Sequence, residues 1–79
     1  MGSIRIMNNN EQTMQHYQQH VLEEEADIES KLGKLMLFIK SEQFSCLTVE
    51  QQDLLNMQYY AMELYSHALS LRIKAFNVP

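Results

Sequence analysis

The sequence contains very few residues that break a helix. Two glycines and one proline occur among its 79 residues, and the proline is the last residue, Pro79. Turn-rich all-β domains need many more of both. The scarcity therefore favours an all-α protein, and we expect two long helices joined by a short connector that assemble into an oligomeric helical bundle.

Cysteine is equally scarce, since Cys46 is the only one. An internal disulfide is therefore excluded, and no CxxC or HExxH motif indicates a zinc site. A chain this short buries a modest part of its surface and usually needs a disulfide, a metal or a partner chain for stability. We therefore expect a homo-oligomer that has no metal and no cofactor.

Positive charge is also in short supply. Six Lys and Arg stand against ten Asp and Glu, which gives a net charge of -4 at pH 7, whereas long nucleic acids are bound by basic faces. The longest mainly apolar run, residues 35–39, is too short to span a bilayer. Residues 1–6 lack the apolar core of a signal peptide. We expect a cytoplasmic protein with neither long nucleic acid nor membrane as its partner.

The chain divides into an N-terminal segment over residues 1–10, expected to be disordered or added for expression, and a helical hairpin over residues 11–79. The first helix is predicted over residues 11–40, where apolar side chains recur at spacings of three, four and seven. Its acidic cluster, residues 23–29, is typical of a solvated face. Gly33 serves either a close helix crossing or an opening of the backbone toward a ligand.

A capping box marks the start of the second helix. The Thr48 hydroxyl can accept from the Gln51 amide while the Gln51 side chain returns to the Thr48 amide, which predicts a helix from Val49. The connector before it, residues 41–47, is expected to form a single helical turn with its apolar side chains tucked under the hairpin. Cys46 within it is expected to act as a small apolar filler.

The second helix carries two apolar rows with a seven-residue period. The first is an a/d seam rich in alanine, which lets another helix approach closely. This seam consists of Leu54, Met57, Ala61, Leu64, Ala68, Leu71 and Ala75. The row that flanks it consists of Leu55, Met62, Leu69 and Phe76. One neighbour cannot bury both rows, so we expect the first helix to cover one and another copy to cover the other.

The oligomer interface is predicted where the apolar surface exceeds what one hairpin can hide. Residues 35–39 are apolar on every side of the first helix and therefore need more than one neighbour. The interface is assigned to residues of both helices, namely Leu35, Phe38, Leu54, Ala61, Met62, Ala68, Leu69 and Phe76.

No combination of residues predicts catalysis, and we expect no enzyme. The acidic residues fall on one exposed stretch, so they do not converge on a metal or a substrate. His16 and His20 lie one turn apart and can bind a metal in principle, but no third ligand follows at a suitable spacing, which favours a surface role. His67 is expected to be partly buried at the interface.

One polar row is a candidate ligand site. Gln58, Tyr65 and Arg72 repeat every seven residues beside the apolar face of the second helix. An amide, an aromatic hydroxyl and a guanidinium can hydrogen-bond a ligand, stack on a base and hold a phosphate. Lys31 and Lys34 can add positive charge. The plainer interpretation is a polar rim to the interface, with Arg72 lying over apolar neighbours and the two lysines in solvent.

Together these positions give the chain a likeness to other proteins. It resembles a family of short helical proteins of tailed phages and prophages, over roughly residues 17–76. The likeness includes polar positions that packing alone does not require, namely Glu24, Lys31, Gln58, Tyr65 and Arg72. Glu25 departs from the pattern, since a basic residue is expected there, and this puts a charged site on the first helix in doubt. The resemblance implies a phage accessory protein acting in the bacterial cytoplasm.

An analogy of size and architecture extends this implication to an activity. Several small helical phage proteins oligomerise and sequester nucleotide immune signals without doing chemistry. By this analogy the chain would bind a cyclic or NAD-derived nucleotide in pockets between subunits, with Arg72 on a phosphate, Tyr65 on the base and Gln58 on a polar edge. The alternative is a helical interaction module that docks on a host or phage protein as an inhibitor or assembly factor.

Overall fold

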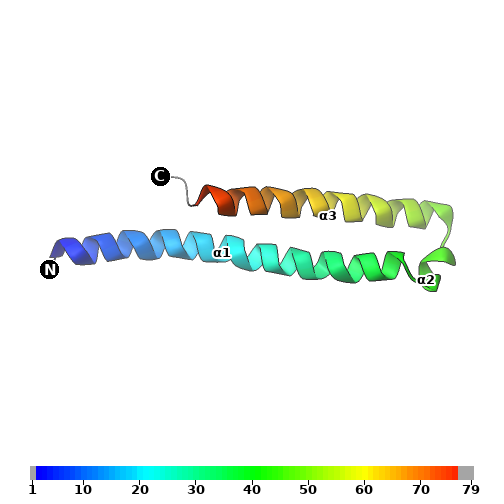
Figure 1. Ribbon diagram of the computed structural model, residues 1–79, viewed down its shortest axis with the longest axis horizontal. Coiled ribbons are helices and arrows are strands. Elements are labelled where there is room, and N and C mark those ends of the chain that lie inside the picture. Colours follow the sequence, from blue (N-terminus) through cyan, green and yellow to red (C-terminus); the bar gives the residue numbers. More distant parts are fainter. Residues whose placement is uncertain (1, 77–79) are drawn as a thin grey trace.

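The computed structural model of the chain is an all-helical hairpin (Figure 1). Helix α1 spans Gly2–Ile39, the short helix α2 spans Glu42–Ser45, and helix α3 spans Val49–Ala75. The structure describes the backbone of residues 2–76 and the side chains of residues 16–76. Helices α1 and α3 lie antiparallel, side by side, and α2 reverses the chain at one end. The predicted all-α hairpin is confirmed.

Helix α1 begins earlier than the sequence predicted. The structure begins this helix at Gly2, whereas the sequence predicted its start near residue 11. No proline lies in this stretch and its one glycine stands at the first helical position, so no residue there interrupts the hydrogen bonds of the helix. Because α1 has 38 residues and α3 has 27, the first turns of α1 extend beyond the end of α3 (Figure 1).

Side-chain caps fix the two helices that follow α1. The Ser41 hydroxyl accepts from the amide of Phe44 at 3.3 Å and caps α2. The Thr48 hydroxyl accepts from the amide of Gln51 at 3.2 Å, while the Gln51 side-chain oxygen accepts from the Thr48 amide at 3.4 Å. The predicted capping box and the start of α3 at Val49 are therefore confirmed.

The connector packs as the sequence predicted, with one exception. Phe44 is half-buried and meets Phe38 edge to face, with ring centroids 6.4 Å apart. The side-chain nitrogen Nε2 of Gln52 donates to the carbonyl oxygens of Phe44 at 3.0 Å and Leu47 at 3.2 Å, which ties α3 back to the connector. Cys46 is exposed, so its expected role as an apolar filler is wrong.

The core is a narrow seam between α1 and α3. Among residues 16–76 the buried apolar side chains are Val21 and Leu69, which are 3% and 1% exposed. Half-buried apolar side chains continue the seam on both helices: Ile28, Leu32, Leu35, Phe38 and Ile39 from α1, and Leu55, Tyr59, Met62, Ile73 and Phe76 from α3. Of the two predicted rows on α3, α1 therefore covers the flanking row.

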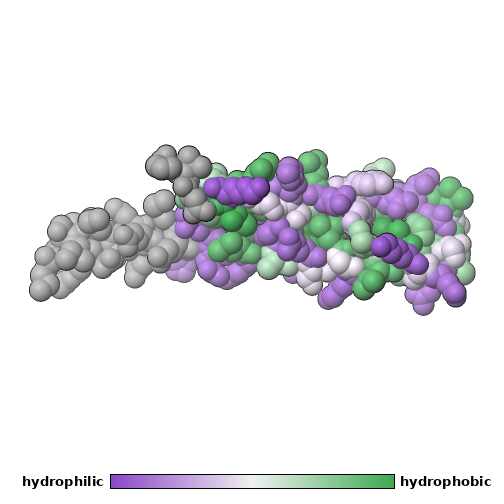
Figure 2. Space-filling view, viewed as in Figure 1, coloured by the Kyte–Doolittle hydropathy of each residue, from purple (hydrophilic) through white to green (hydrophobic). Residues whose placement is uncertain are grey.

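The a/d seam of α3 faces away from α1 and lies in solvent. Its residues are all exposed, and we call them the outer seam: Leu54, Met57, Ala61, Leu64, Ala68, Leu71 and Ala75. Leu64, at its middle, is 70% exposed. On α1, Leu37 is 73% exposed, so residues 35–39 are not enclosed by the hairpin either. Figure 2 shows apolar side chains at the surface among the polar ones along the described part of the rod.

The hairpin is long and thin. Its Cα radius of gyration is 18.9 Å, whereas a compact domain of this length would have about 12 Å. Within residues 2–76, neither long helix has the sustained apolar stretch that a membrane crossing requires.

Candidate functional site

Polar and aromatic side chains of α1 and α3 meet along one edge of the hairpin. The guanidinium of Arg72 donates to the hydroxyl of Tyr17 and lies over its ring, 5.4 Å from the centroid. Seven residues earlier on α3, the Tyr65 hydroxyl donates to the carboxylate of Glu24. Tyr17 and Glu24 are also seven residues apart on α1, so both contacts belong to one antiparallel register.

The same register places Gln58 opposite Lys31, because each lies one heptad nearer the turn. Gln58 contacts the sulfur of Met62 at 3.8 Å. Lys31 pairs with Asp27 at 3.0 Å, with both side chains largely in solvent. Lys34 is exposed and falls outside this heptad position, so the structure does not bring it to the same line.

We call this line of six residues the polar edge: Tyr17, Glu24 and Lys31 of α1, and Gln58, Tyr65 and Arg72 of α3. Its members on each helix span fourteen residues, which is about 21 Å at 1.5 Å per residue. The two cations, Arg72 and Lys31, therefore stand at opposite ends. Between them lies the pair formed by Tyr65 and Glu24. The polar row predicted on α3 is thus half of a two-helix feature.

The chemistry of the polar edge changes along its length. The hydrogen bond to Glu24 raises the pKa of the Tyr65 hydroxyl above its ordinary value, with further contributions from desolvation and the negative charge of Glu24. Tyr65 therefore stays neutral at physiological pH, with an exposed ring. The Glu24 carboxylate can accept from hydroxyl or amino groups but repels phosphate. An anionic group of a ligand is expected at an end of the edge, on Arg72 or Lys31.

Beside the polar edge, one carboxylate of the acidic cluster is buried. Glu25 is 9% exposed and its oxygens accept from the hydroxyl of Ser66 at 3.2 Å and from that of Ser70 at 3.0 Å. These donors offset part of the cost of burying a charge. The solvated face expected for residues 23–29 is therefore wrong at Glu25. The hydrogen bond and charge of Glu25 also raise the pKa of Glu29 one turn later.

The residues assigned to the oligomer interface fall into two groups. Leu69 is buried inside the hairpin and cannot contact another copy, which corrects its assignment. Met62 and Phe76 belong to the same covered row and are half-buried; Phe76 packs edge to face on Tyr17, with centroids 6.1 Å apart. The others remain at least partly accessible, and that group consists of Leu35, Phe38, Leu54, Ala61 and Ala68.

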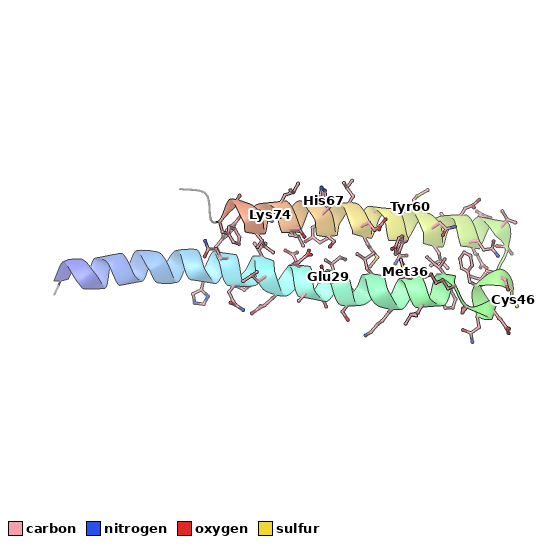
Figure 3. All side chains as sticks on the ribbon, in the orientation of Figure 1. Glu29, Met36, Cys46, Tyr60, His67 and Lys74 are labelled. Atoms are coloured by element: carbon pink, nitrogen blue, oxygen red, sulfur yellow. The ribbon has the colours of Figure 1, made fainter. Side chains whose placement is uncertain are left out.

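Other candidate positions lie away from the polar edge. A Cβ placed on Gly33 would meet no atom within 4 Å, so no close crossing inside the hairpin requires this glycine. His67, which Figure 3 labels on α3, is exposed on the hairpin, and its expected place at an interface between copies stays a prediction. His16 and His20 are exposed, with ring centroids 6.3 Å apart. In the part of the chain whose side chains are described, no three potential metal ligands come together.

Sequence reasoning missed the contributions of Tyr17 and Glu24 to the site. The ring of Tyr17 packs against the guanidinium of Arg72, and the carboxylate of Glu24 accepts a hydrogen bond from the hydroxyl of Tyr65. The signal was present, since both share the seven-residue spacing of Lys31 on α1. This spacing alone could not assign Tyr17 and Glu24 to the site, because the sequence does not show which heptad position of α1 faces the row on α3.

These features define a class of protein: a small all-helical hairpin with a polar edge on one side and an open apolar seam on another. A family model named Sequestin matches residues 15–75, which is most of the chain. The chain belongs to the Sequestin family, whose name indicates sequestration of a ligand. Neither the curated proteins nor the solved structures that were compared gave a match.

Proposed function

We propose that this protein is a phage accessory protein that sequesters a nucleotide immune signal of the bacterial host and does not alter it chemically. The observation that carries the proposal is the polar edge, where a guanidinium, an aromatic hydroxyl and an amide stand in one line with a lysine. The family name supports sequestration as the general activity. The bacterial cytoplasm, where such signals arise, is the proposed place of action.

Each side chain has a defined part in this proposal. Arg72 contacts a phosphate, because its contact with Tyr17 uses only one face and one nitrogen of the guanidinium and leaves other N–H groups for two parallel hydrogen bonds. Tyr65 stacks on the base or bonds to it, and Gln58 reads a polar edge of the base. Lys31 adds positive charge at the end of the polar edge away from Arg72. Lys34, three residues later on α1, adds to the positive potential around Lys31.

Glu24 gives this arrangement a preference among anions. A nucleotide carries ribose hydroxyls and exocyclic amino groups, which are donors that a carboxylate accepts, whereas inorganic phosphate offers no comparable set. A nucleotide also carries phosphate for Arg72, so it engages both kinds of group, whereas a simple anion engages a cation alone. This difference favours a cyclic or NAD-derived nucleotide over a simple anion.

Calorimetric titration with a panel of cyclic and NAD-derived nucleotides tests the proposal. At least one nucleotide is expected to bind and to be recovered unchanged by chromatography. Arg72→Ala is expected to weaken binding at least tenfold, and Arg72→Lys to weaken it less, because lysine keeps the charge but loses the planar fork. Lys40→Ala, an exposed residue outside the polar edge, makes the same change in net charge and serves as the control.

Two results would count against sequestration. The first is an absence of binding across the panel by protein whose circular dichroism shows intact helices. The second is conversion of the nucleotide during incubation with protein and Mg²⁺, which would indicate an enzyme.

A second candidate function rests on the outer seam. An exposed apolar stripe along a helix suits docking into a groove of a host or phage protein, as an inhibitor or an assembly factor. Affinity purification that recovers one stoichiometric protein partner, together with no nucleotide binding, would favour this function over the first.

A further inference from the structure

We propose that two copies of this chain pack α3 against α3 in antiparallel orientation, and that each ligand site is completed by a residue pair from the other copy. The packing follows from the outer seam alone. The completion of the ligand site rests on the proposed function, because it assigns the polar edge to a ligand with phosphate groups.

The outer seam has the pattern of a helix that packs on its own copy. Its leucines and methionine alternate with Ala61, Ala68 and Ala75 at heptad spacing, and small residues let helix axes approach to about 8 Å. The antiparallel register that overlaps the greatest length of the seam places Leu64 on the two-fold axis, with Met57 opposite Leu71 of the other copy.

Charge along α3 favours the antiparallel orientation over the parallel one. The helix has Glu50 in its first turn and Arg72 and Lys74 in its last. In the register centred on Leu64, exposed Asp53 faces Lys74 of the other copy at both ends of the interface. A parallel pair would set Asp53 against Gln58 of the other copy and leave Asp53 and Lys74 at opposite ends of the interface, so neither charge would gain a partner of opposite sign.

Side chains between these charges fit the same register. Tyr60 and His67 share the heptad position of Asp53 and Lys74, and three of these four are labelled along α3 in Figure 3. The two-fold axis places Tyr60 opposite His67 of the other copy. The exposed His67 and the exposed Tyr60 therefore gain a partner, and neither faces its own kind.

The polar edge lies on the flank of the outer seam opposite to Asp53, Tyr60, His67 and Lys74. In the dimer, residues of the second copy join the polar edge there. On α3, the heptad position of Gln58, Tyr65 and Arg72 lies between the row that α1 covers and the outer seam. The two-fold axis therefore sets Arg72 opposite Gln58 of the other copy, and Tyr65 opposite Tyr65 of the other copy. Both polar edges then line the same face of the four-helix array.

A single hairpin cannot bring its two cations to one phosphate-bearing ligand, because Arg72 and Lys31 stand about 21 Å apart on it. In the dimer, a lysine of the other copy comes to the same end as Arg72. Its Gln58 faces Arg72, and its Lys31 stands beside that Gln58 in the hairpin register. Each end of the dimer thus holds Arg72 over Tyr17 from one copy, with Gln58 and Lys31 from the other. The dimer has two such ends, related by symmetry.

Disulfide trapping tests the packing directly. In a Cys46→Ser background, Leu64→Cys is expected to form a covalent dimer under mild oxidation, since it lies on the two-fold axis. Met57→Cys is expected to cross-link with added Leu71→Cys protein and not with itself. Leu64→Cys would cross-link with itself in either orientation, but in a parallel dimer Met57→Cys would also cross-link with itself, and that result would overturn the orientation. Ser30→Cys, an exposed position on α1, is the control that should remain uncross-linked.

Sedimentation of charge variants gives an independent test. Asp53→Lys alone and Lys74→Asp alone are each expected to shift the dimer toward monomer, because each creates two like-charge pairs. The double variant is expected to restore the dimer. A wild-type protein that sediments as a monomer at all concentrations would overturn the packing, and nucleotide binding by that monomer would leave the proposed function standing.

Complementation tests whether the ligand site is shared. Arg72→Ala dimers and Gln58→Ala, Lys31→Ala dimers each have two damaged ends, but a mixed dimer has one end with every residue intact. Mixing the two proteins under exchange conditions is expected to restore about one quarter of the wild-type sites at wild-type affinity. Restoration of no sites by mixed, verified dimers would mean that each site belongs to one chain. Correct cross-links without binding of any nucleotide would reject the shared site and the proposed function together, while the packing would hold.

Discussion

Tyr65 is the residue of the polar edge whose chemistry depends most on a single neighbour. Its hydroxyl donates to Glu24, and this hydrogen bond is the largest cause of its raised pKa. A tyrosine whose pKa is raised by folding contributes stability below its ordinary pKa and loses that contribution as the pH rises through the folded value. The contact therefore operates throughout the physiological range and is lost in alkali, when the hydroxyl ionises.

Replacement of Glu24 by Gln tests this contact. The substitution removes the negative charge, so the pKa of Tyr65 is expected to fall toward its ordinary value, and the tyrosinate absorbance of one of the four tyrosines moves to lower pH. Glu23→Gln is the matched control, because Glu23 is exposed and contributes to the raised pKa of neither Tyr59 nor Tyr65. An alkaline titration unchanged by Glu24→Gln would show that the hydrogen bond does not persist in solution.

Replacement of Gly33 tests whether another helix packs closely against this glycine or whether no packing requires it. An added Cβ meets no atom of the hairpin, so Gly33→Ala is expected to stabilise the protein by about 1 kcal/mol through helix propensity. For a chain of this size, that corresponds to a rise in Tm of roughly 4–8 °C.

Ala26→Gly, one heptad earlier and also exposed, should lower Tm by a similar amount and provides the matched control. A loss of stability in Gly33→Ala together with a smaller mass in solution would instead show that another copy crosses α1 at this glycine.

At the scale of the elements, the start of α3 depends on a single side chain. The Thr48 hydroxyl satisfies the Gln51 amide at the first turn. Thr48→Ala is expected to cost about 1 kcal/mol of unfolding free energy, and Thr48→Ser to cost little, because serine retains the hydroxyl. Urea unfolding followed by circular dichroism measures both. Equal stability of the alanine and serine variants would show that the cap does not hold α3 in solution.

The elements that sequence could predict are those determined by local chemistry. The capping box of Thr48 and Gln51 and the helical periodicity of α3 need no knowledge of the rest of the fold, and the cap and the helix that they predict are both present. Which apolar row faces α1 was left open, since both rows are apolar and share the seven-residue period. The structure begins α1 at Gly2 rather than near residue 11, because the asparagines at residues 8–10 are weak helix formers but do not stop a helix that is already propagating.

The candidate site was only half predictable for a related reason. Gln58, Tyr65 and Arg72 share a helix, so their spacing alone placed them in line. Their partners on α1 depend on the antiparallel register, which the sequence of either helix does not specify. The burial of Glu25 has the same origin, because its hydroxyl donors, Ser66 and Ser70, come from the other helix.

At the scale of the whole molecule, the balance between exposed and buried apolar surface governs stability and association. A rod with extents of 65 × 18 × 15 Å has little interior, and Val21 and Leu69 are its buried apolar side chains among residues 16–76. Two helices in contact along one narrow seam gain little from packing, while the cost of ordering every residue remains. A second copy on the outer seam would supply the burial that the hairpin lacks.

This balance predicts that stability depends on protein concentration. When folding is coupled to association, Tm rises with concentration, because mass action favours the assembled state. The wild-type Tm is therefore expected to rise across a concentration series from micromolar to millimolar protein, as measured by circular dichroism.

Leu64→Arg puts two like charges at the proposed two-fold axis, so it should lower Tm and remove the concentration dependence. Leu37→Arg makes the same substitution at an equally exposed leucine on α1 and should leave the dependence in place. A wild-type Tm that stays constant on dilution would mean that the thin seam between α1 and α3 suffices by itself, and the outer seam would then be free for a different partner.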